Sequence, residues 1–426
     1  MTTDARDNEP RRDVFRLPGY LAFWTAYSVS GFGTYITTIA LQVLVVLTLG
    51  GTAADVGLVN GARWLPYLLF GLVIGALVDR RRRKPLLVGA DFARALLLGA
   101  IPALWALGWL SLPVLIVFVA VFGFFALVGD AASISLLPRI VPRAYLLPAH
   151  ARTDQSDAVA QTSGPVVAGG LITLVGAPIA VLVDAASYLI SGVLVSRIRV
   201  AEPPAEVRRR RQLGPDIRAG LRWVYRHRTL TPMAIGTHGW FLFNAVLTTV
   251  FVPFALLELR LTAFELGLAL AAAGVAGLLG SSVSTRLGTR WGVGRTVIAC
   301  NILMAVGWAV IALVPAGGTV LVIVVLAVGQ GLYGLGLGLS NANEMGYRQA
   351  ITPDNLQARM NTTIRSVNRA MIVVGAPLGG FLAVGLGYRL ALWIGVGGFV
   401  LVVMFLALSP FRSARHGDAL SAGAEG

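Results

Sequence analysis

The sequence is poor in charged residues, in cysteine and in lysine. Charged residues make up 13% of the 426 positions, whereas a typical soluble domain has about a quarter. The single cysteine, Cys300, excludes an intramolecular disulfide and a cysteine-based metal site. The single lysine, Lys84, lies in no Gly-rich phosphate-binding loop, which excludes P-loop ATP hydrolysis by this chain. No catalytic triad or metal-ligand cluster is visible, so we expect neither enzyme activity nor a cofactor.

Apolar residues, by contrast, are in excess. They make up 56% of the chain, and the mean hydropathy is +0.76. Apolar tracts of about 20 residues recur, and each is long enough to cross the roughly 30 Å of hydrocarbon in a bilayer as a helix. Twelve spans are predicted, over residues 20–49, 54–77, 86–108, 112–137, 155–175, 177–197, 230–257, 263–287, 294–314, 318–345, 359–385 and 389–409. The predicted fold is therefore an all-α membrane protein with twelve transmembrane helices in the lipid bilayer.

A polar central segment divides these spans into two sets of six. It includes "AEPPAEVRRRRQLGPDIRAGLRWVYRHRTL", in which Pro-Pro and four arginines are typical of a linker. The part "IRAGLRWVYRH" is typical of a short helix on the membrane surface. The expected organisation is a cytoplasmic tail at 1–19, a six-helix bundle at 20–197, a cytoplasmic basic linker at 198–229, a second six-helix bundle at 230–409 and a cytoplasmic tail at 410–426.

The net charge of +15 is concentrated in alternate loops. Most of the 35 Lys and Arg residues fall in the two tails, the linker and the loops on one side of the predicted membrane, whereas the other side keeps only Arg260 and Arg389. The positive-inside rule then predicts a multi-pass protein of the inner cell membrane with both termini in the cytoplasm. Because every basic cluster directly adjoins a span, we expect no nucleic-acid partner.

The two halves also contain an internal repeat. "LLPRIVPRAYLLPAHARTDQSDAVAQTSGPVVAGG" in the first half has a counterpart in "GYRQAITPDNLQARMNTTIRSVNRAMIVVGAPLGG", with Pro142 matching Pro353. Repeats of six spans are typical of transporters whose two pseudo-symmetric bundles rock about a site near the bilayer midplane. Close helix packing is expected at the small residues and prolines of both copies, which are Gly164, Pro165, Gly169, Gly170, Gly375, Pro377, Gly379 and Gly380.

The stretch "GALVDRRRRK" from Gly75 to Lys84 resembles motif A of the major facilitator superfamily. The resemblance extends over nearly the whole chain, through the twelve spans, the repeat and the basic linker. "DFARALLL", "LLPRIVPR" and "RQAITPDNLQARMN" further resemble the bacterial exporters grouped with enterobactin and macrolide efflux carriers. This resemblance implies a monomeric secondary transporter.

Motif A also implies roles for charged residues around the second and third spans. Asp79 matches the acidic position that pairs with the start of span eleven in the outward-facing state, and Arg83 matches a basic position in a charge relay. The expected acidic partner of Arg83 is Asp130. The other residues expected to belong to this gating group are Gly75, Arg80, Asp91 and Arg94. The sequence departs from the motif at position 82, where arginine replaces the usual glycine, and span four lacks the arginine that many proton-driven members use.

Two ionisable residues lie deep within predicted spans, where they are functional candidates by default. For Arg63 two interpretations stay open: a side chain that reaches helix carbonyls or headgroups, and one that lines a substrate cavity. For Asp184 the alternatives are a protonatable site and a packed, hydrogen-bonded carboxyl group, and we favour the packed carboxyl.

Polar and aromatic residues also recur on one face of three spans. They are Trp24, Tyr27, Thr34, Thr38 and Gln42 in span one, His238, Phe241, Asn244 and Thr248 in span seven, and Gln330, Tyr333, Asn341 and Glu344 in span ten. Hydrogen bonds between helices would explain such stripes. We favour a substrate cavity, because the resemblance implies that spans one, four, seven and ten line it. For His238 the alternatives are a proton site and a packed histidine, and we favour the packed one.

The leading functional hypothesis is secondary active export of small amphiphilic organic molecules, driven by proton antiport with alternating access. The expected partners are thus a small-molecule substrate, protons and lipid. A siderophore exporter and a proton-coupled importer are the alternatives within the transporter class. A non-transporting membrane sensor or scaffold is the alternative outside it.

Overall fold

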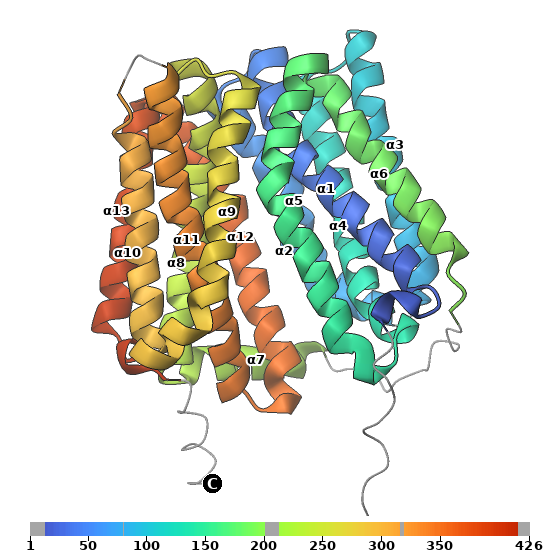
Figure 1. The fold of residues 1–426 in the computed structure, drawn as a ribbon, viewed down its shortest axis with the longest axis vertical. Coiled ribbons are helices and arrows are strands. Elements are labelled where there is room, and N and C mark those ends of the chain that lie inside the picture. Colours follow the sequence, from blue (N-terminus) through green and yellow to red (C-terminus); the bar gives the residue numbers. More distant parts are fainter. Residues whose placement is uncertain (1–12, 80, 201–212, 316–318, 416–426) are drawn as a thin grey trace, which may run out of the picture.

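The computed structural model describes residues 13–79, 81–200, 213–315 and 319–415, without the side chains of residues 72, 75, 76, 79, 213, 216 and 319. Regular structure in these ranges is helical throughout (Figure 1). The first half contributes α1 (Tyr20–Val43), α2 (Ala53–Asp79), α3 (Arg83–Ala106), α4 (Leu112–Ile140), α5 (Leu146–Val175) and α6 (Ala177–Arg197). The shorter helix α7 (Leu213–Arg226) follows. The second half contributes α8 (Leu230–Pro253), α9 (Ala263–Trp291), α10 (Val293–Ala312), α11 (Thr319–Ile351), α12 (Asp354–Leu386) and α13 (Tyr388–Leu408).

Each predicted span coincides with one long helix, and the predicted fold class is confirmed. Eleven helices among the described residues have the length and hydropathy of membrane spans. The twelfth long helix, α2, has 27 residues and packs between α4 and α12. Several helices extend beyond the predicted spans, because an apolar tract marks only the part of a helix that lies in hydrocarbon. Thus α11 continues past residue 345 to Ile351 and ends just before Pro353, which disfavours helical geometry in the residue that precedes it.

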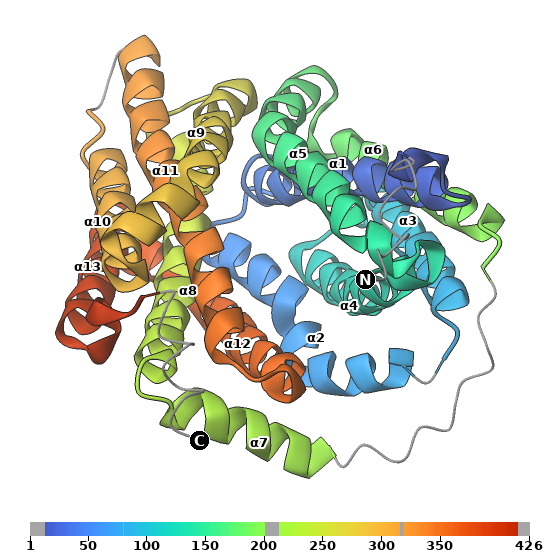
Figure 2. The same cartoon turned by 60° about the horizontal axis from the view of Figure 1, so that its bottom comes forward.

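The long helices form two bundles that lie side by side (Figure 1). In the first bundle α1 packs against α5 and α6, and α4 packs against α2 and α3. In the second bundle α11 packs against α9 and α10, and α8 packs against α12 and α13. The bundles meet mainly through α2 with α12 and α5 with α9. The short helix α7 lies across one end of the molecule and contacts α12 and α8 (Figures 1 and 2).

We call the end that carries α7 the α7 end and the opposite end the closed end. At the closed end, glycines bring the two bundles into direct backbone contact. A Cβ atom on Gly57 of α2 would collide with the backbone of Ala376 and Pro377 of α12, and one on Gly267 of α9 would collide with the backbone of Pro165 of α5. The other residues expected to pack closely also lie at helix contacts: Gly164 against Tyr35, Gly169 against Ala263, Gly170 against Phe264, Gly375 against Leu242, Gly379 against Val246, and Gly380 against Ala53.

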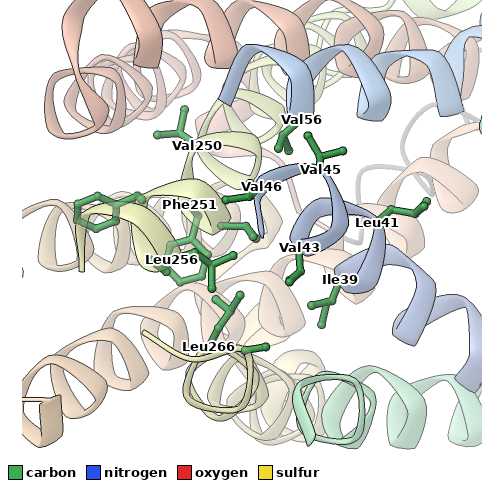
Figure 3. Close-up of a cluster of buried hydrophobic side chains, with 14 of the residues drawn as sticks. Ile39, Leu41, Val43, Val45, Val46, Val56, Val250, Phe251, Leu256 and Leu266 are labelled. Atoms are coloured by element: carbon green, nitrogen blue, oxygen red, sulfur yellow. The ribbon is translucent and has the colours of Figure 1, made fainter. Parts of the chain in front are cut away.

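The repeat is visible in local structure as well. A π-helical turn extends α1 over Leu44–Thr48, and another extends α8 over Phe254–Glu258. Just after each turn, a threonine and an acid form reciprocal hydrogen bonds at the start of the next helix, as Thr52 with Asp55 and Thr262 with Glu265. The apolar residues around these turns pack into one cluster that joins both bundles near the closed end (Figure 3).

Candidate substrate cavity and the polar network beside it

A cavity of about 830 Å³ lies where the second bundle faces the first. This volume is within the range of roughly 300–1,000 Å³ that is usual for small-molecule sites. The first bundle contributes Trp64 of α2 and Gln161 of α5 to its wall. The second bundle contributes residues of α8, α10, α11 and α12, among them Thr237, Trp240, Phe241, Asn244, Thr248, Met304, Ser340, Asn341, Glu344, Arg348, Arg365, Asn368 and Arg369.

The cavity extends toward the α7 end. Its wall includes Met233 near the start of α8, Arg348 near the end of α11 and Asn361 near the start of α12. All three of these helix ends lie on the side of the molecule that carries α7 (Figure 2). Contacts between the bundles, in contrast, are concentrated at the closed end. The cavity therefore extends toward the α7 end, and the glycine contacts between the bundles lie at the opposite end.

The predicted stripes of spans seven and ten divide into two groups. Phe241, Asn244, Thr248, Asn341 and Glu344 all contribute to the cavity wall. Glu344 accepts hydrogen bonds from Ser340 at 2.7 Å and from Thr237 at 3.2 Å.

Behind this wall, Tyr333 donates a hydrogen bond of 2.9 Å to Asn244 and thereby joins α11 to α8. Gln330 is buried, and neither Gln330 nor Tyr333 is part of the cavity wall.

His238 is held between three helices and is not part of the cavity wall. Its Nδ1 atom lies 2.7 Å from Oδ1 of Asn368 on α12, and its Nε2 atom lies 2.9 Å from the hydroxyl of Tyr225 on α7. An Oδ1 acceptor places the imidazole proton on Nδ1, so that the tyrosine hydroxyl donates to Nε2. Both ring nitrogens of His238 are thus used in joining α7, α8 and α12.

Two arginines of α12 that were not singled out from the sequence are part of the cavity wall. Arg365 and Arg369 lie one helical turn apart. The guanidinium carbon of Arg369 lies 4.0 Å from the ring centroid of Trp64 and 5.6 Å from that of Tyr67. The signal that could have found them is their position inside the predicted span 359–385, where a cation is a functional candidate.

The predicted stripe of span one serves contacts within the first bundle. Trp24 donates to the carbonyl of Arg152 at 3.2 Å, Tyr27 donates to Asp157 at 2.6 Å, and the hydroxyl of Thr34 lies 2.8 Å from that of Tyr188. Gln42 is buried and donates to the carbonyl of Thr38 at 3.3 Å. No residue of this stripe belongs to the cavity wall described above.

The two ionisable residues deep in the first bundle, Arg63 and Asp184, are not part of the cavity wall. Arg63 donates to Thr38 at 2.8 Å, and its guanidinium carbon lies 5.9 Å from the ring centroid of Trp64. Asp184 is fully buried against Gly33 of α1 and accepts a hydrogen bond of 2.9 Å from Ser187. Its second carboxylate oxygen has no hydrogen-bond partner among the described residues. Among the described residues, Arg63 and Arg94 are the two cations whose charges act on Asp184.

Asp91 and Arg94 form a buried ion pair on α3. Ser191 of α6 donates to Asp91 at 2.7 Å, and the guanidinium carbon of Arg94 lies 4.1 Å from the ring centroid of Tyr188. This pair therefore attaches α3 to α6.

Of the remaining residues of the predicted gating group, the structure describes the side chains of Asp130 and Arg83. Asp130 of α4 accepts a hydrogen bond of 2.7 Å from Tyr67 of α2. Arg83 is the first residue of α3. The side chains of Gly75 and Asp79, and the whole of Arg80, lie outside the described residues.

Comparison with known proteins decides the family. The profile of the family described as transmembrane secretion effector, MFS_3, matches residues 11–423. The chain belongs to this family. The resemblance to major facilitator exporters is thereby confirmed, and the chain is a multi-pass membrane transporter by family.

Two relatives in this family are efflux proteins. The chain is 28% identical over 371 residues to the multidrug efflux pump Tap of Mycolicibacterium fortuitum, an alignment that covers 83% of this chain and 86% of Tap. It is 26% identical over 188 residues to macrolide efflux protein A of Streptococcus pyogenes, covering 42% of this chain and 44% of that protein.

A solved relative is available in two states. A bacterial homologue of the iron transporter ferroportin superimposes with a TM-score of 0.67 in its inward-facing state, at 16% identity, over 92% of this chain and 98% of that one. The outward-facing structure gives a TM-score of 0.61 at the same identity and coverage. At this identity the likeness concerns the fold alone.

Proposed function

We propose that the chain is a secondary active exporter of small amphiphilic organic molecules. The observation that carries the proposal is the cavity of about 830 Å³ beside the bundle interface, whose wall combines Trp64, Trp240 and Phe241 with asparagines and charged groups. Aromatic and polar groups together suit molecules that have both an apolar body and polar substituents. Membership of the secretion effector family and the efflux activity named for two relatives support the outward direction.

The α7 end is the cytoplasmic side in this proposal, because the arginine-rich helix α7 and the basic turn between α4 and α5 lie there. The molecule is then inward-facing and ready to take substrate from the cytoplasm or the inner leaflet. Transport requires the contacts at the closed end to part while the bundles approach each other at the α7 end. In keeping with the resemblance to motif A, Asp79, Arg83 and Asp130 act when the bundles approach each other at the α7 end.

Proton antiport supplies the energy. A proton that crosses a potential of 100 mV contributes about 2.3 kcal/mol, enough for a gradient of roughly 50-fold. We assign the coupling proton to Asp184, in place of the packed role favoured from the sequence, because this carboxylate is fully buried and lies outside the substrate cavity. Its protonation removes a charge that attracts Arg63. Since Arg63 and Arg369 both contact the ring of Trp64, the change reaches the cavity wall.

Growth inhibition tests the function. An efflux-deficient bacterial host expressing this chain is compared, over a broad panel of antibiotics, dyes and siderophores, with a host expressing the Asp79→Asn variant at a matched membrane level. Export predicts protection by the parent and loss of protection in the variant. Absence of protection by either protein would favour the importer or the sensor instead.

The Asp184→Asn variant tests the coupling. Purified in proteoliposomes, it is expected to bind substrate as the parent does and to lose substrate-dependent proton movement. The matched control is Asp354→Asn, which removes an exposed acid at the start of α12. Equal proton movement in the parent and in Asp184→Asn would contradict the assignment.

A further inference from the structure

We propose that this cavity selects organic anions: molecules that carry a carboxylate, sulfonate or phosphate on an apolar or aromatic body. The inference rests on the proposed function and goes further, because it names the charge of the substrate. Four side chains with a full charge contribute to the wall, and three of them are arginines. Arg348, Arg365 and Arg369 face a single acid, Glu344, so the wall has an excess of positive charge.

The acid of the cavity is already occupied. One oxygen of Glu344 accepts the hydroxyl of Ser340 at 2.7 Å, and the other shares the hydroxyl proton of Thr237, at 3.2 Å, with the backbone carbonyl of Met233. Arg348, one turn further along α11, donates its Nε–H to the backbone carbonyl of Glu344 at 3.3 Å. Glu344 and Arg348 thus balance each other at one side of the cavity, and the surplus charge is that of the two α12 arginines.

Those two arginines have no acidic partner among the described side chains. No ion pair joins Arg365 or Arg369 to a carboxylate among the described residues. The guanidinium carbon of Arg369 instead lies 4.0 Å from the ring centroid of Trp64. Its Nε–H is shielded from solvent and has no acceptor among the described residues. Asp130 attracts Arg369 from a distance, yet it accepts the hydroxyl of Tyr67 and is not part of the cavity wall.

Arg365 is exposed, whereas Arg369 is half-buried with a shielded Nε–H. A cation partly withdrawn from water without a hydrogen-bonded counter-charge is destabilised, and a bound anion would offset that cost at Arg369. A second donor in the wall points the same way. The indole N–H of Trp240 is shielded and has no acceptor among the described residues. The cavity thus offers donors and positive charge next to aromatic surface. An amphiphile that ends in an anion can accept hydrogen bonds from Arg369 and Trp240 and place its apolar body on the aromatic surface. A cationic amine can accept from neither Arg369 nor Trp240.

Equilibrium binding to a matched pair of probes tests the inference. The purified full chain in nanodiscs is titrated with dansylglycine, an anion, and with a dansyl amide that ends in a trimethylammonium group, a cation. The dansyl fluorescence reports binding in both cases. We expect the anion to bind at least about tenfold more tightly, and Arg369→Gln to weaken anion binding by about 10- to 100-fold, as expected for a charged hydrogen bond.

Three controls keep the result specific. Arg369→Lys keeps the charge and is expected to recover most of the anion preference. Arg412→Gln removes an exposed arginine near the end of the described chain and should leave both affinities unchanged. Thermal unfolding of each variant checks that the fold is intact.

Equal or tighter binding of the cation, an anion preference that survives Arg369→Gln, or failure of both probes to bind would each overturn the inference. Anion binding without any protection or transport would leave the inference standing and overturn the proposed function.

Discussion

The closed end depends on glycine at position 57, and a single methyl group there should shift the balance between the two states. A Cβ atom at Gly57 would lie 3.0 Å from Cα of Pro377 and closer still to the carbonyl oxygen of Ala376. These are backbone atoms, which cannot move away as a flexible side chain can, so the closed end has to open. Overpacking of this kind costs about 1–3 kcal/mol. Because the cost falls only on the state in which α2 and α12 touch, it moves the equilibrium by about 5- to 150-fold.

Cysteine labelling measures this shift. The native Cys300 is first replaced by alanine, and a single cysteine is introduced at Ala54, which is buried in the same contact. Gly57→Ala should raise the labelling rate of the cysteine at position 54 by about 5- to 150-fold. It should lower the labelling rate of a cysteine placed at Asn361 in the cavity. Gly71→Ala is the matched control, because a Cβ on Gly71 of the same helix meets no atom within 4 Å.

Equal labelling in Gly57→Ala and Gly71→Ala would refute the reasoning. Faster labelling at both cysteines together with a lower unfolding temperature would indicate partial unfolding, which also contradicts a change between two folded states.

Two further predictions concern stability. Arg94→Met leaves Asp91 buried without its counter-charge and should lower the free energy of unfolding by about 3–5 kcal/mol. The double variant Asp91→Asn with Arg94→Met should recover part of the lost stability. Thermal unfolding in nanodiscs measures both effects. His227, outside the spans, accepts the backbone N–H groups of Thr229 and Leu230 at the start of α8, and burial lowers the pKa of its imidazole below the ordinary 6.5. The contribution of neutral His227 to stability is therefore complete above pH 6.5 and is lost as the pH falls through the lowered pKa. The unfolding temperature should drop between pH 6.5 and 5 in the parent and should drop less in His227→Asn. Equal drops in the parent and the variant would contradict the assignment.

Apolar runs predicted all twelve long helices, because a stretch of about 20 apolar residues has few alternatives to a membrane span. The amphipathic helix α7 was also predicted from the linker. Helix ends were less predictable: α5 begins at Leu146, well before the predicted residue 155. Its first turns carry polar residues that need water rather than lipid, and hydropathy does not register a helix that continues into water.

The cavity could be predicted only in part. A polar residue within a span is satisfied equally well by a neighbouring helix or by a cavity, and sequence spacing does not distinguish the two. Asn244 and Glu344 lie in the cavity wall, while Tyr27 and Thr34 form hydrogen bonds inside the first bundle. Arg365 lies close to a basic loop, where positive charge is also explained by topology, whereas Arg369 lies deeper in the predicted span and could have been singled out.

Transport into everted membrane vesicles tests the central claim most directly. Vesicles that contain the chain are energised with an inwardly acidic proton gradient, and uptake of compounds from the protective panel is followed with and without a protonophore. The account predicts uptake that requires the chain, stops when the gradient is dissipated and is accompanied by proton release from the vesicles. Uptake that is unchanged by the protonophore would contradict proton antiport, and no uptake by chain-containing vesicles of any compound in the panel would contradict export itself.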